Sequence, residues 1–317
     1  MYVLGIDAGG TKTHAAIGDE KGNILAEGYG GPANYQSCGK KITCVSLVNA
    51  IEDAFKNLND LLDDQTNLVI ISELQYAVFG MSGADEAEDI EILNRLVGKI
   101  MGPIPFRVIH DAWIGLRAAS DDNIGVVSIC GTGAGHVGRN SRGDEGQLRN
   151  LDYITGNYGG GGQMVEDALH YAFRSEEGTG RKTSLEQVLP KLFETEDMAG
   201  ISRILRHDGM TNTQRYSIPI AVFQEAQKGD KVAHDIIDHM GQVEGEYAAG
   251  LIRRLHMEQD KVPMILIGSL FRTGEPILID AYMRAVHECA PSAYPVILQE
   301  APVSGAVKLA ADQISAV

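Results

Sequence analysis

Residues 1–18 constrain the fold of this chain more than any other segment. An apolar strand, Val3–Asp7, ends in an acid and is followed by a turn that contains Gly9 and Gly10. A second apolar strand follows at Thr13–Ile17. No helix pattern follows the glycines, so the segment is not the Gly-x-x-x-x-Gly-Lys-Ser/Thr loop of many nucleotide-binding proteins. Two strands joined by a glycine turn predict a β-hairpin.

The chemistry of this turn suits a phosphate. Glycines let backbone N–H groups approach an anion that a side chain would exclude. Thr11, Lys12 and Thr13 add hydroxyl and ammonium donors, and Asp7 offers a carboxylate for a hydrated Mg²⁺. An ordinary glycine-rich β-turn would have the same appearance, so this segment alone is consistent with both interpretations.

A second copy of the pattern favours the phosphate-binding interpretation. The apolar run Ile124–Ile129 leads into a turn with Gly131, Thr132 and Gly133, and strand-like residues follow from His136. Two strand–turn–strand segments of this kind indicate a duplicated architecture. A nucleotide held between two such turns is the natural consequence.

Composition limits the class of protein. A length of 317 residues is enough for two domains with their own cores. The formal charge of −16 argues against a nucleic-acid partner, and no apolar run approaches the roughly 20 residues that cross a bilayer. The first strand begins directly after Met1, which leaves no room for a signal peptide, and the four cysteines form no Cys-x-x-Cys pair. We therefore expect a cytoplasmic chain with reduced thiols and no membrane partner.

Periodicity along the chain predicts an α/β plan. After the first strands and a third at Ile24–Glu27, the first half alternates helices at 42–62, 87–100 and 112–119 with strands at 75–80 and 106–109. Asp111 follows the last of these strands, where ligands gather in open α/β sheets. An alternative role for Asp111 is the N-cap of the helix that follows. For the second half we expect strands at 124–129 and 262–267 and helices at 164–173, 185–193, 217–228, 231–255 and 303–312.

Five motifs in order resemble the sugar-kinase/Hsp70/actin fold, and within it the BadF/BadG/BcrA/BcrD ATPase family, which includes N-acetylglucosamine kinases. They are Asp7-x-Gly9-Gly10-Thr11, Ser82-Gly83, His110-Asp111-Ala112, Gly131-Thr132-Gly133 and Gly268-Ser269. The resemblance implies an α/β fold of two ribonuclease-H-like (actin-like ATPase) domains around a central cleft. It places the first domain at 1–112 with the C-terminal helix 302–317, and the second at 113–301.

The same resemblance implies roles for individual residues. Asp111 matches the general base that acts on a sugar hydroxyl, and Asp7 the acid that holds Mg²⁺ through water. The implied ATP-binding residues are Gly9, Gly10, Thr11, Lys12, Thr13, Gly131, Thr132, Gly133, Gly268 and Ser269. The implied sugar-binding residues are Asn34, Ser82, Gly83, Asp111, Ala134, Gly135 and Asn157.

One element departs from the family. Its kinases carry a Gly-Asp-Glu-Gly stretch, whereas this chain has Asn157 and Tyr158 in place of the two acids. Asparagine can still bond a sugar hydroxyl, but it also donates and carries no charge. The family's upstream Gly-Trp-Gly is absent, and Asp152 is a possible replacement for the lost carboxylate. The identity of the acceptor sugar therefore stays open.

The resemblance implies a homodimeric kinase that uses ATP and Mg²⁺ to phosphorylate the 6-hydroxyl of an amino sugar in cell-wall sugar salvage. N-acetylglucosamine is the first choice of substrate and N-acetylmuramic acid the second. Alternatives are a glucosamine kinase, a sugar sensor without kinase activity, and an ATPase that drives electron transfer. The last needs cysteines that hold an iron–sulfur cluster, and the scattered cysteines here do not favour it.

Overall fold

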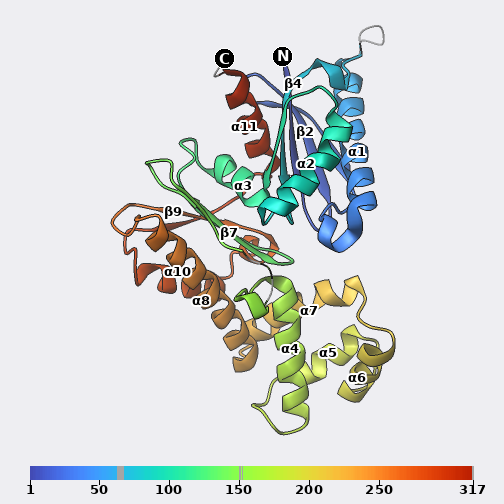
Figure 1. Ribbon diagram of the computed structural model, residues 1–317. Coiled ribbons are helices and arrows are strands. Elements are labelled where there is room, and N and C mark those ends of the chain that lie inside the picture. Colours follow the sequence, from blue (N-terminus) through green and yellow to red (C-terminus); the bar gives the residue numbers. More distant parts are fainter. Residues whose placement is uncertain (63–67, 150, 152, 316–317) are drawn as a thin grey trace. The chain divides into compact units, whose positions relative to one another are not determined.

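The structure is a computed structural model that describes residues 1–62, 68–149, 151 and 153–315 (Figure 1). The chain divides into two compact units, and the division passes through a strand between Val127 and Ser128. Unit one comprises Met1–Val127, Val137–Leu151 and Leu298–Val317, and unit two comprises Ser128–His136 and Asp152–Ile297. No helix in the described part of the chain combines the length and the apolar character that a bilayer span requires.

Unit one is built on a five-stranded sheet with the order β3-β2-β1-β4-β5. The first three strands are antiparallel neighbours, and β4 and β5 run parallel to β1. The predicted hairpin is confirmed, because β1 and β2 pair directly across the first glycine turn. The strands are β1 (Tyr2–Ala8), β2 (Thr13–Asp19), β3 (Ile24–Gly30), β4 (Leu74–Met81) and β5 (Phe106–His110).

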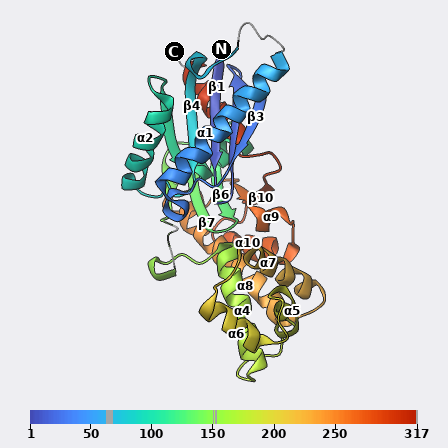
Figure 2. The ribbon, with the colours of Figure 1, turned by 90° about the vertical axis from the view of Figure 1, so that its right-hand side faces the viewer.

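Helices cover both faces of this sheet (Figures 1 and 2). Successive strand residues point to opposite faces, so Leu4 and Ile6 join a core with α1 and α2, whereas Val3 joins a core with α3 and α11. The C-terminal helix α11 packs on β1 as the resemblance implies, and Gly5 permits this because a Cβ there would lie 2.6 Å from the backbone N of Val307. The helices are α1 (Tyr35–Leu62), α2 (Ala87–Met101), α3 (Asp111–Ala119) and α11 (Val303–Ser315), with a 3₁₀ turn at Ile71–Glu73.

Helix α1 starts seven residues before the predicted start at 42, since the structure begins it at Tyr35. Its first part is a separate helical segment, because Gly39 has φ 81° and ψ 153° and interrupts the helix. The Asn34 side chain accepts a hydrogen bond from the backbone N of Gln36 at 3.0 Å and so supports this start. The early segment carries little apolar periodicity, which is why the sequence pattern missed it.

A second five-stranded sheet has the order β10-β9-β6-β7-β8. Strands β9 and β10 are parallel, whereas β7 and β8 are antiparallel. Two short strands, β8 and β10, were not predicted. The strands are β6 (Gly125–Cys130), β7 (Ala134–Arg139), β8 (Glu145–Gln147), β9 (Pro263–Ile267) and β10 (Tyr294–Ile297).

Unit two adds a set of helices, several of which form the helical group in the lower part of Figure 2. Glycines at 241 and 245 let α8 lie against α10, since a Cβ at either position would come within 2.4 Å of a carbonyl oxygen of α10. The short helices α6 and α9 and the helix α10 were not predicted. The helices are α4 (Gly160–Glu176), α5 (Leu185–Leu192), α6 (Met198–His207), α7 (Asn212–Gln227), α8 (Lys231–Arg254), α9 (Ser269–Arg272) and α10 (Pro276–His287), with a 3₁₀ turn at Tyr153–Thr155.

Candidate functional site

The first glycine turn projects from the end of the β1–β2 hairpin. The backbone N of Gly9 donates to the carbonyl of Lys12 at 2.9 Å and closes the turn. Gly10, Thr11 and Lys12 are exposed, so their backbone and side-chain donors face solvent. Thr13 differs, because it is buried and its hydroxyl donates to the carbonyl of Gly31 at 2.8 Å. The hydroxyl of Thr13 therefore stabilises the turn through a hydrogen bond to the backbone and does not face solvent.

A buried histidine, which the sequence analysis missed, stands beside this turn. His14 on β2 is 4% exposed, and its Nε2 lies 3.1 Å from a carboxylate oxygen of Glu27. Burial lowers the pKa of His14, although Glu27 opposes that shift. The ring stacks on Tyr29 with centroids 4.5 Å apart, and the ammonium of Lys12 lies 6.0 Å from the Tyr29 centroid. Tyr29 thus helps to hold Lys12 near the turn by a cation–π contact.

Three residues predicted to bind sugar lie together next to the first turn. The side-chain amide of Asn34 donates to the hydroxyl of Ser82 at 3.1 Å. The backbone N of Ser82 donates to the carbonyl of Ala8 at 2.9 Å, which ties this group to the end of β1. Gly83 has φ 82°, and a Cβ there would come within 2.9 Å of the Asn34 side-chain oxygen. The local backbone therefore requires glycine beside Asn34.

The end of β5 carries a cluster of three titratable side chains. His110 is the N-cap of α3, and its Nδ1 accepts from the backbone N of Ala112 at 3.1 Å. The same Nδ1 lies 3.1 Å from a carboxylate oxygen of Asp111, and Nε2 lies 3.3 Å from a carboxylate oxygen of Asp85. Asp111 is the first residue of α3, so the alternative role of Asp111 as N-cap is wrong. Its carboxylate lies in the first turn of α3, against the His110 ring.

Burial and charge shift the proton equilibria of this cluster. Burial lowers the pKa of His110, but the carboxylates of Asp111 and Asp85 outweigh it, so the His110 pKa lies above its ordinary value. Burial raises the pKa of Asp111, with Asp85 adding to the increase and His110 opposing it. Both pKa values are raised, and the two groups lie 3.1 Å apart, so Asp111 and His110 form an electrostatically coupled pair whose titrations depend on one another. Asp85 and His110 were not among the predicted site residues.

Replacement of Asp85 by asparagine tests this electrostatic account. Asp85→Asn removes a negative charge next to the imidazole, so we expect the pKa of His110 to fall. An NMR titration of the His110 ring protons measures the shift. Asp121→Asn is the control, since the side chain of Asp121 is fully exposed. An unchanged His110 pKa in Asp85→Asn would contradict the assignment of Asp85 as its charge partner.

The second glycine turn lies in unit two, against the first turn of α4. The backbone N of Gly161 donates to the carbonyl of Gly131 at 2.7 Å, and that of Gly162 donates to the carbonyl of Thr132 at 3.0 Å. A Cβ at Gly160 would meet the Gly133 backbone at 2.6 Å. The run of glycines therefore belongs to the start of α4 at Gly160, not to a loop before a helix at 164. Helix α4 thus supports the turn.

Gly268 and Ser269, the residues predicted to contact the adenosine, lie beside the same turn. Gly268 has φ 110° and ψ 167°, a conformation that is essentially restricted to glycine. A Cβ at this position would come within 2.3 Å of the Cys130 carbonyl oxygen. Ser269 begins the short helix α9. The end of β9 and the second glycine turn are therefore in direct contact.

Asn157 is held between two backbone hydrogen bonds to one tyrosine. The hydroxyl of Tyr247 on α8 accepts from the backbone N of Tyr158 at 2.7 Å and donates to the carbonyl of Gly156 at 3.0 Å. The side-chain oxygen of Asn157 is buried and has no hydrogen-bond partner among the described residues. The Tyr158 hydroxyl donates to Asp167 on α4. Asp152, the possible replacement carboxylate, lies outside the described residues.

A contact between a histidine and a carboxylate is buried next to the second turn. His136 on β7 and Glu244 on α8 have fully buried side chains, and Nε2 lies 3.0 Å from a carboxylate oxygen. Burial raises the pKa of the Cys130 thiol, and Glu244 adds to this shift. A thiol with a raised pKa is a poor metal ligand or nucleophile. Cys130 is therefore part of the packing under the turn, and the four cysteines are all free.

Unit one supplies Asp7, the first turn, the Asn34 group and Asp111, whereas unit two supplies the second turn, Gly268 and Asn157. The oxygen donors near the first turn fit Mg²⁺, which keeps several waters and takes one or two carboxylates from the protein. Within the described ranges, no group of three or more His, Cys, Asp or Glu side chains could hold a metal ion. Because Mg²⁺ needs only one or two carboxylates from the protein, a single Asp7 carboxylate acting through water is compatible with Mg²⁺ binding.

Comparisons with known proteins identify the family of this chain. The sequence profile of the BadF/BadG/BcrA/BcrD ATPase family matches residues 4–310. The chain is 29% identical over 316 residues to an N-acetyl-D-glucosamine kinase of Dictyostelium discoideum, with 97% of each chain covered. It is 26% identical over 311 residues to an N-acetylmuramic acid/N-acetylglucosamine kinase of Clostridium acetobutylicum, with 98% of each chain covered.

Solved structures share the fold. A Chromobacterium violaceum protein provisionally named an N-acetylglucosamine kinase aligns with a TM-score of 0.73 at 20% identity, over 97% of this chain and 98% of that one. A ROK family glucokinase from Streptomyces griseus, solved with glucose and AMPPNP, aligns with a TM-score of 0.59 at 17% identity, over 98% of both chains. These similarities confirm the predicted α/β fold of the actin-like sugar-kinase type.

Proposed function

Because this chain belongs to the BadF/BadG/BcrA/BcrD ATPase family, we propose that it is an ATP-dependent kinase for the 6-hydroxyl of an amino sugar. The observation that carries the proposal is the Asp111 carboxylate, which follows the end of β5 and is paired with His110. N-acetylglucosamine is the first choice of acceptor, since the names of both curated relatives include it. A homodimer, a cytoplasmic location and a role in cell-wall sugar salvage belong to the same proposal.

The proposed nucleotide site uses the two glycine turns. Phosphoryl transfer depends mainly on positioning and on neutralising charge, so backbone N–H groups and hydroxyls near the phosphates contribute most. Thr11 and Lys12 of the first turn and Thr132 of the second would contact the terminal phosphates. Gly268 and Ser269 would contact the adenosine side. Asp7 would hold Mg²⁺ through water, and the ion would offset charge on the β- and γ-phosphates.

Asp111 is the proposed general base. As the 6-hydroxyl oxygen bonds to the γ-phosphorus, the O–H bond breaks and the proton passes to the Asp111 carboxylate. The bond from the γ-phosphorus to its bridging oxygen breaks, and ADP leaves. The raised pKa of Asp111 makes it a better proton acceptor than an ordinary aspartate. His110, whose Nδ1 lies 3.1 Å from the carboxylate, helps to position Asp111.

The test is ATP turnover by the purified chain against a panel of amino sugars. The proposal expects turnover that requires a sugar and yields the 6-phosphate of that sugar, detected by mass spectrometry and NMR. ATP hydrolysis that no sugar stimulates would overturn the kinase assignment and favour the alternative of an ATPase or sensor.

Asn157 is expected to set the preference among acceptors. An uncharged amide avoids repulsion of the lactyl carboxylate of N-acetylmuramic acid, and it gives no ionic attraction to the cationic glucosamine. We expect kcat/KM to be highest for N-acetylglucosamine, then N-acetylmuramic acid, then glucosamine. Asn157→Asp is expected to lower kcat/KM for N-acetylmuramic acid relative to the other two. A clear preference for glucosamine, or a ranking that Asn157→Asp leaves unchanged, would contradict this role.

Tyr247 is expected to act through Asn157. Tyr247→Phe keeps the ring but removes both hydrogen bonds that hold Gly156 and Tyr158. Each neutral hydrogen bond contributes about 0.5–1.5 kcal/mol. We expect KM for the sugar to rise by roughly fivefold to tenfold while KM for ATP stays unchanged. Tyr216→Phe, at a half-exposed tyrosine on α7, is the matched control. Equal increases in both KM values would indicate a general loss of structure instead.

A further inference from the structure

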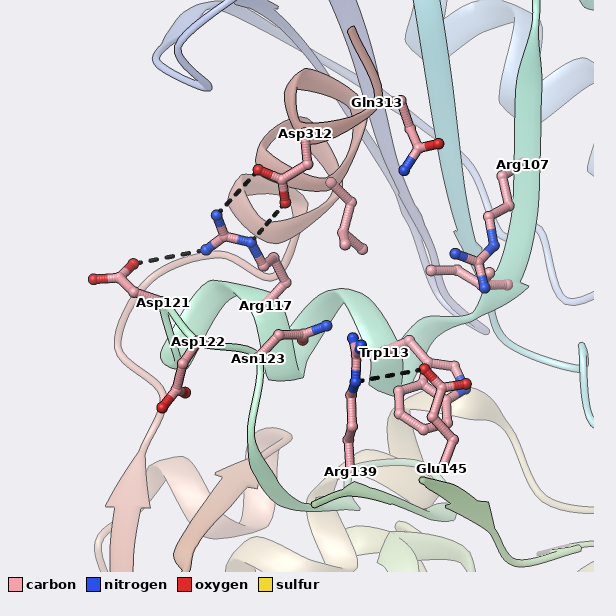
Figure 3. A pocket seen from close by; sticks show the side chains of 12 residues that line it. Arg107, Trp113, Arg117, Asp121, Asp122, Asn123, Arg139, Glu145, Asp312 and Gln313 are labelled. Atoms are coloured by element: carbon pink, nitrogen blue, oxygen red, sulfur yellow. Dashed lines mark hydrogen bonds and ion pairs between the residues drawn. The ribbon is translucent and has the colours of Figure 1, made fainter. Parts of the chain in front are cut away.

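Unit one contains a pocket that no step of the proposed reaction uses. It lies among β5, α3, α11 and the β7–β8 hairpin, and its volume is about 480 Å³ (Figure 3). That volume is in the range of small-molecule sites. None of the residues proposed to bind ATP, Mg²⁺ or the acceptor sugar lines it.

Arginines from three different elements line this pocket. Arg117 on α3 is neutralised, because it donates to Asp312 at 3.0 and 3.4 Å and lies 3.6 Å from Asp121. Arg139 on β7 has a looser partner, with its Nε 3.9 Å from a Glu145 oxygen. Arg107 on β5 forms no ion pair with the other pocket residues (Figure 3). Two guanidinium groups are therefore weakly compensated.

The two acids at the edge of the pocket, Asp121 and Asp122, form no ion pair with Arg107 or Arg139 (Figure 3). Asp122 accepts from the Ser120 hydroxyl at 2.5 Å and from the backbone N of Ile124 at 3.2 Å, so its charge supports the local turn. The side chain of Asp121 is fully exposed to solvent. The lining as a whole is not cationic, because it contains three arginines and four acids. An anion would therefore bind locally, at Arg107 and at Arg139, whose acidic partner Glu145 lies 3.9 Å away. Paired guanidinium forks fit phosphate and carboxylate oxygens in two-point contacts.

The uncharged side chains of the pocket suit a sugar that is attached to that anion. Trp113 on α3 gives a broad apolar surface, of the kind on which sugar rings pack. The side-chain oxygen of Asn123 is buried without a hydrogen-bond partner in the described structure, and Asn123 has φ 57°, a left-handed conformation. The Gln313 amide extends from α11 at the facing wall (Figure 3). Amides at opposite walls can bond hydroxyl groups on two sides.

We propose that this pocket is a second ligand site that binds a sugar phosphate, with the phosphate between Arg107 and Arg139 and the sugar against Trp113. The inference does not require the kinase assignment, because it concerns residues outside the proposed site. It has a consequence for catalysis under that assignment. Trp113 and Arg117 lie on the helix that begins at Asp111, so a ligand here contacts the element that carries the proposed base.

Trp113 is the one tryptophan of the sequence, so intrinsic fluorescence reports on this pocket directly. The full chain is titrated with N-acetylglucosamine 6-phosphate, glucose 6-phosphate, inorganic phosphate and neutral N-acetylglucosamine, and calorimetry repeats each titration. We expect saturable binding of the sugar phosphates, tighter than that of inorganic phosphate or neutral sugar. The two phosphorylated sugars separate the product of the proposed reaction from a sugar phosphate of another source.

Substitutions of the pocket arginines test whether the sugar phosphate binds in this pocket. Arg107→Gln and Arg139→Gln should each weaken sugar-phosphate affinity by about tenfold or more, because each removes a charge-assisted contact. Arg95→Gln, at an exposed arginine of α2, is the control and should leave affinity unchanged. Thermal unfolding verifies that each variant is folded.

Three results would overturn the proposal. The first is an absence of saturable binding by both methods. The second is an affinity that Arg107→Gln and Arg139→Gln leave unchanged. The third is binding that is lost in Asn34→Ala but kept in Arg107→Gln, which would place the ligand in the proposed acceptor site instead.

Discussion

Asp111→Asn is expected to lower kcat for sugar phosphorylation by about 10²–10⁴, the contribution that a positioned general base makes. Asparagine keeps the size and the hydrogen-bonding reach of the side chain but cannot accept the hydroxyl proton. The affinity for ATP should stay unchanged, since Asp111 is not assigned to the nucleotide. Steady-state kinetics and an ATP-analogue binding assay measure the two quantities separately.

The pH profile of the wild-type enzyme gives a second measure of the same residue. The base must be ionised, and the pKa of Asp111 is raised, chiefly by burial. Activity should therefore decline on the acid side at a higher pH than an ordinary aspartate would produce. Asp122→Asn, at an acid outside the proposed ATP and acceptor sites, should keep wild-type kinetics. Turnover by Asp111→Asn within tenfold of wild type would count decisively against Asp111 as the base.

Gly268→Ala is expected to cause the largest loss of stability among the site variants. The φ and ψ of Gly268 cost an alanine about 1–3 kcal/mol. Contact of the new methyl group with the Cys130 carbonyl at 2.3 Å adds roughly another 1–3 kcal/mol from overpacking. Movement of the second turn away from β9 would relieve this steric clash. Because that turn is proposed to bind ATP, KM for ATP should rise as well. Denaturant unfolding and ATP kinetics check the two effects.

A second glycine separates backbone strain from the steric clash. Gly274 also has a positive φ of 67°, but a Cβ there would meet nothing within 4 Å. Gly274→Ala should therefore cost only about 1–2 kcal/mol, with ATP kinetics unchanged. Equal changes in the free energy of unfolding and in KM for ATP for Gly268→Ala and Gly274→Ala would show that the close contact between Gly268 and Cys130 contributes to neither.

Local patterns determined much of this molecule. The first hairpin, the strands β4 and β5 and the helices α2, α3 and α8 follow from apolar periodicity and glycine placement, because those signals act within a few residues. The position of Asp111 after a strand was likewise readable from the sequence. The elements that were missed are short or weakly periodic, such as α6 and β8, where burial against neighbours decides the structure.

Tertiary structure alone decided which residues act together. Asp85 follows the end of β4, and no local pattern indicates that its carboxylate lies 3.3 Å from His110, the residue before Asp111. Tyr247 lies 90 residues or so from the segment that it holds, and Arg107 and Arg139 reach one pocket from two sheets. The physical reason is that hydrogen bonds and charge contacts depend on distance in space, whereas periodicity records only the face that each residue presents. The sequence determines which faces of the helices and strands are apolar. The packing of these elements determines which polar and charged residues meet.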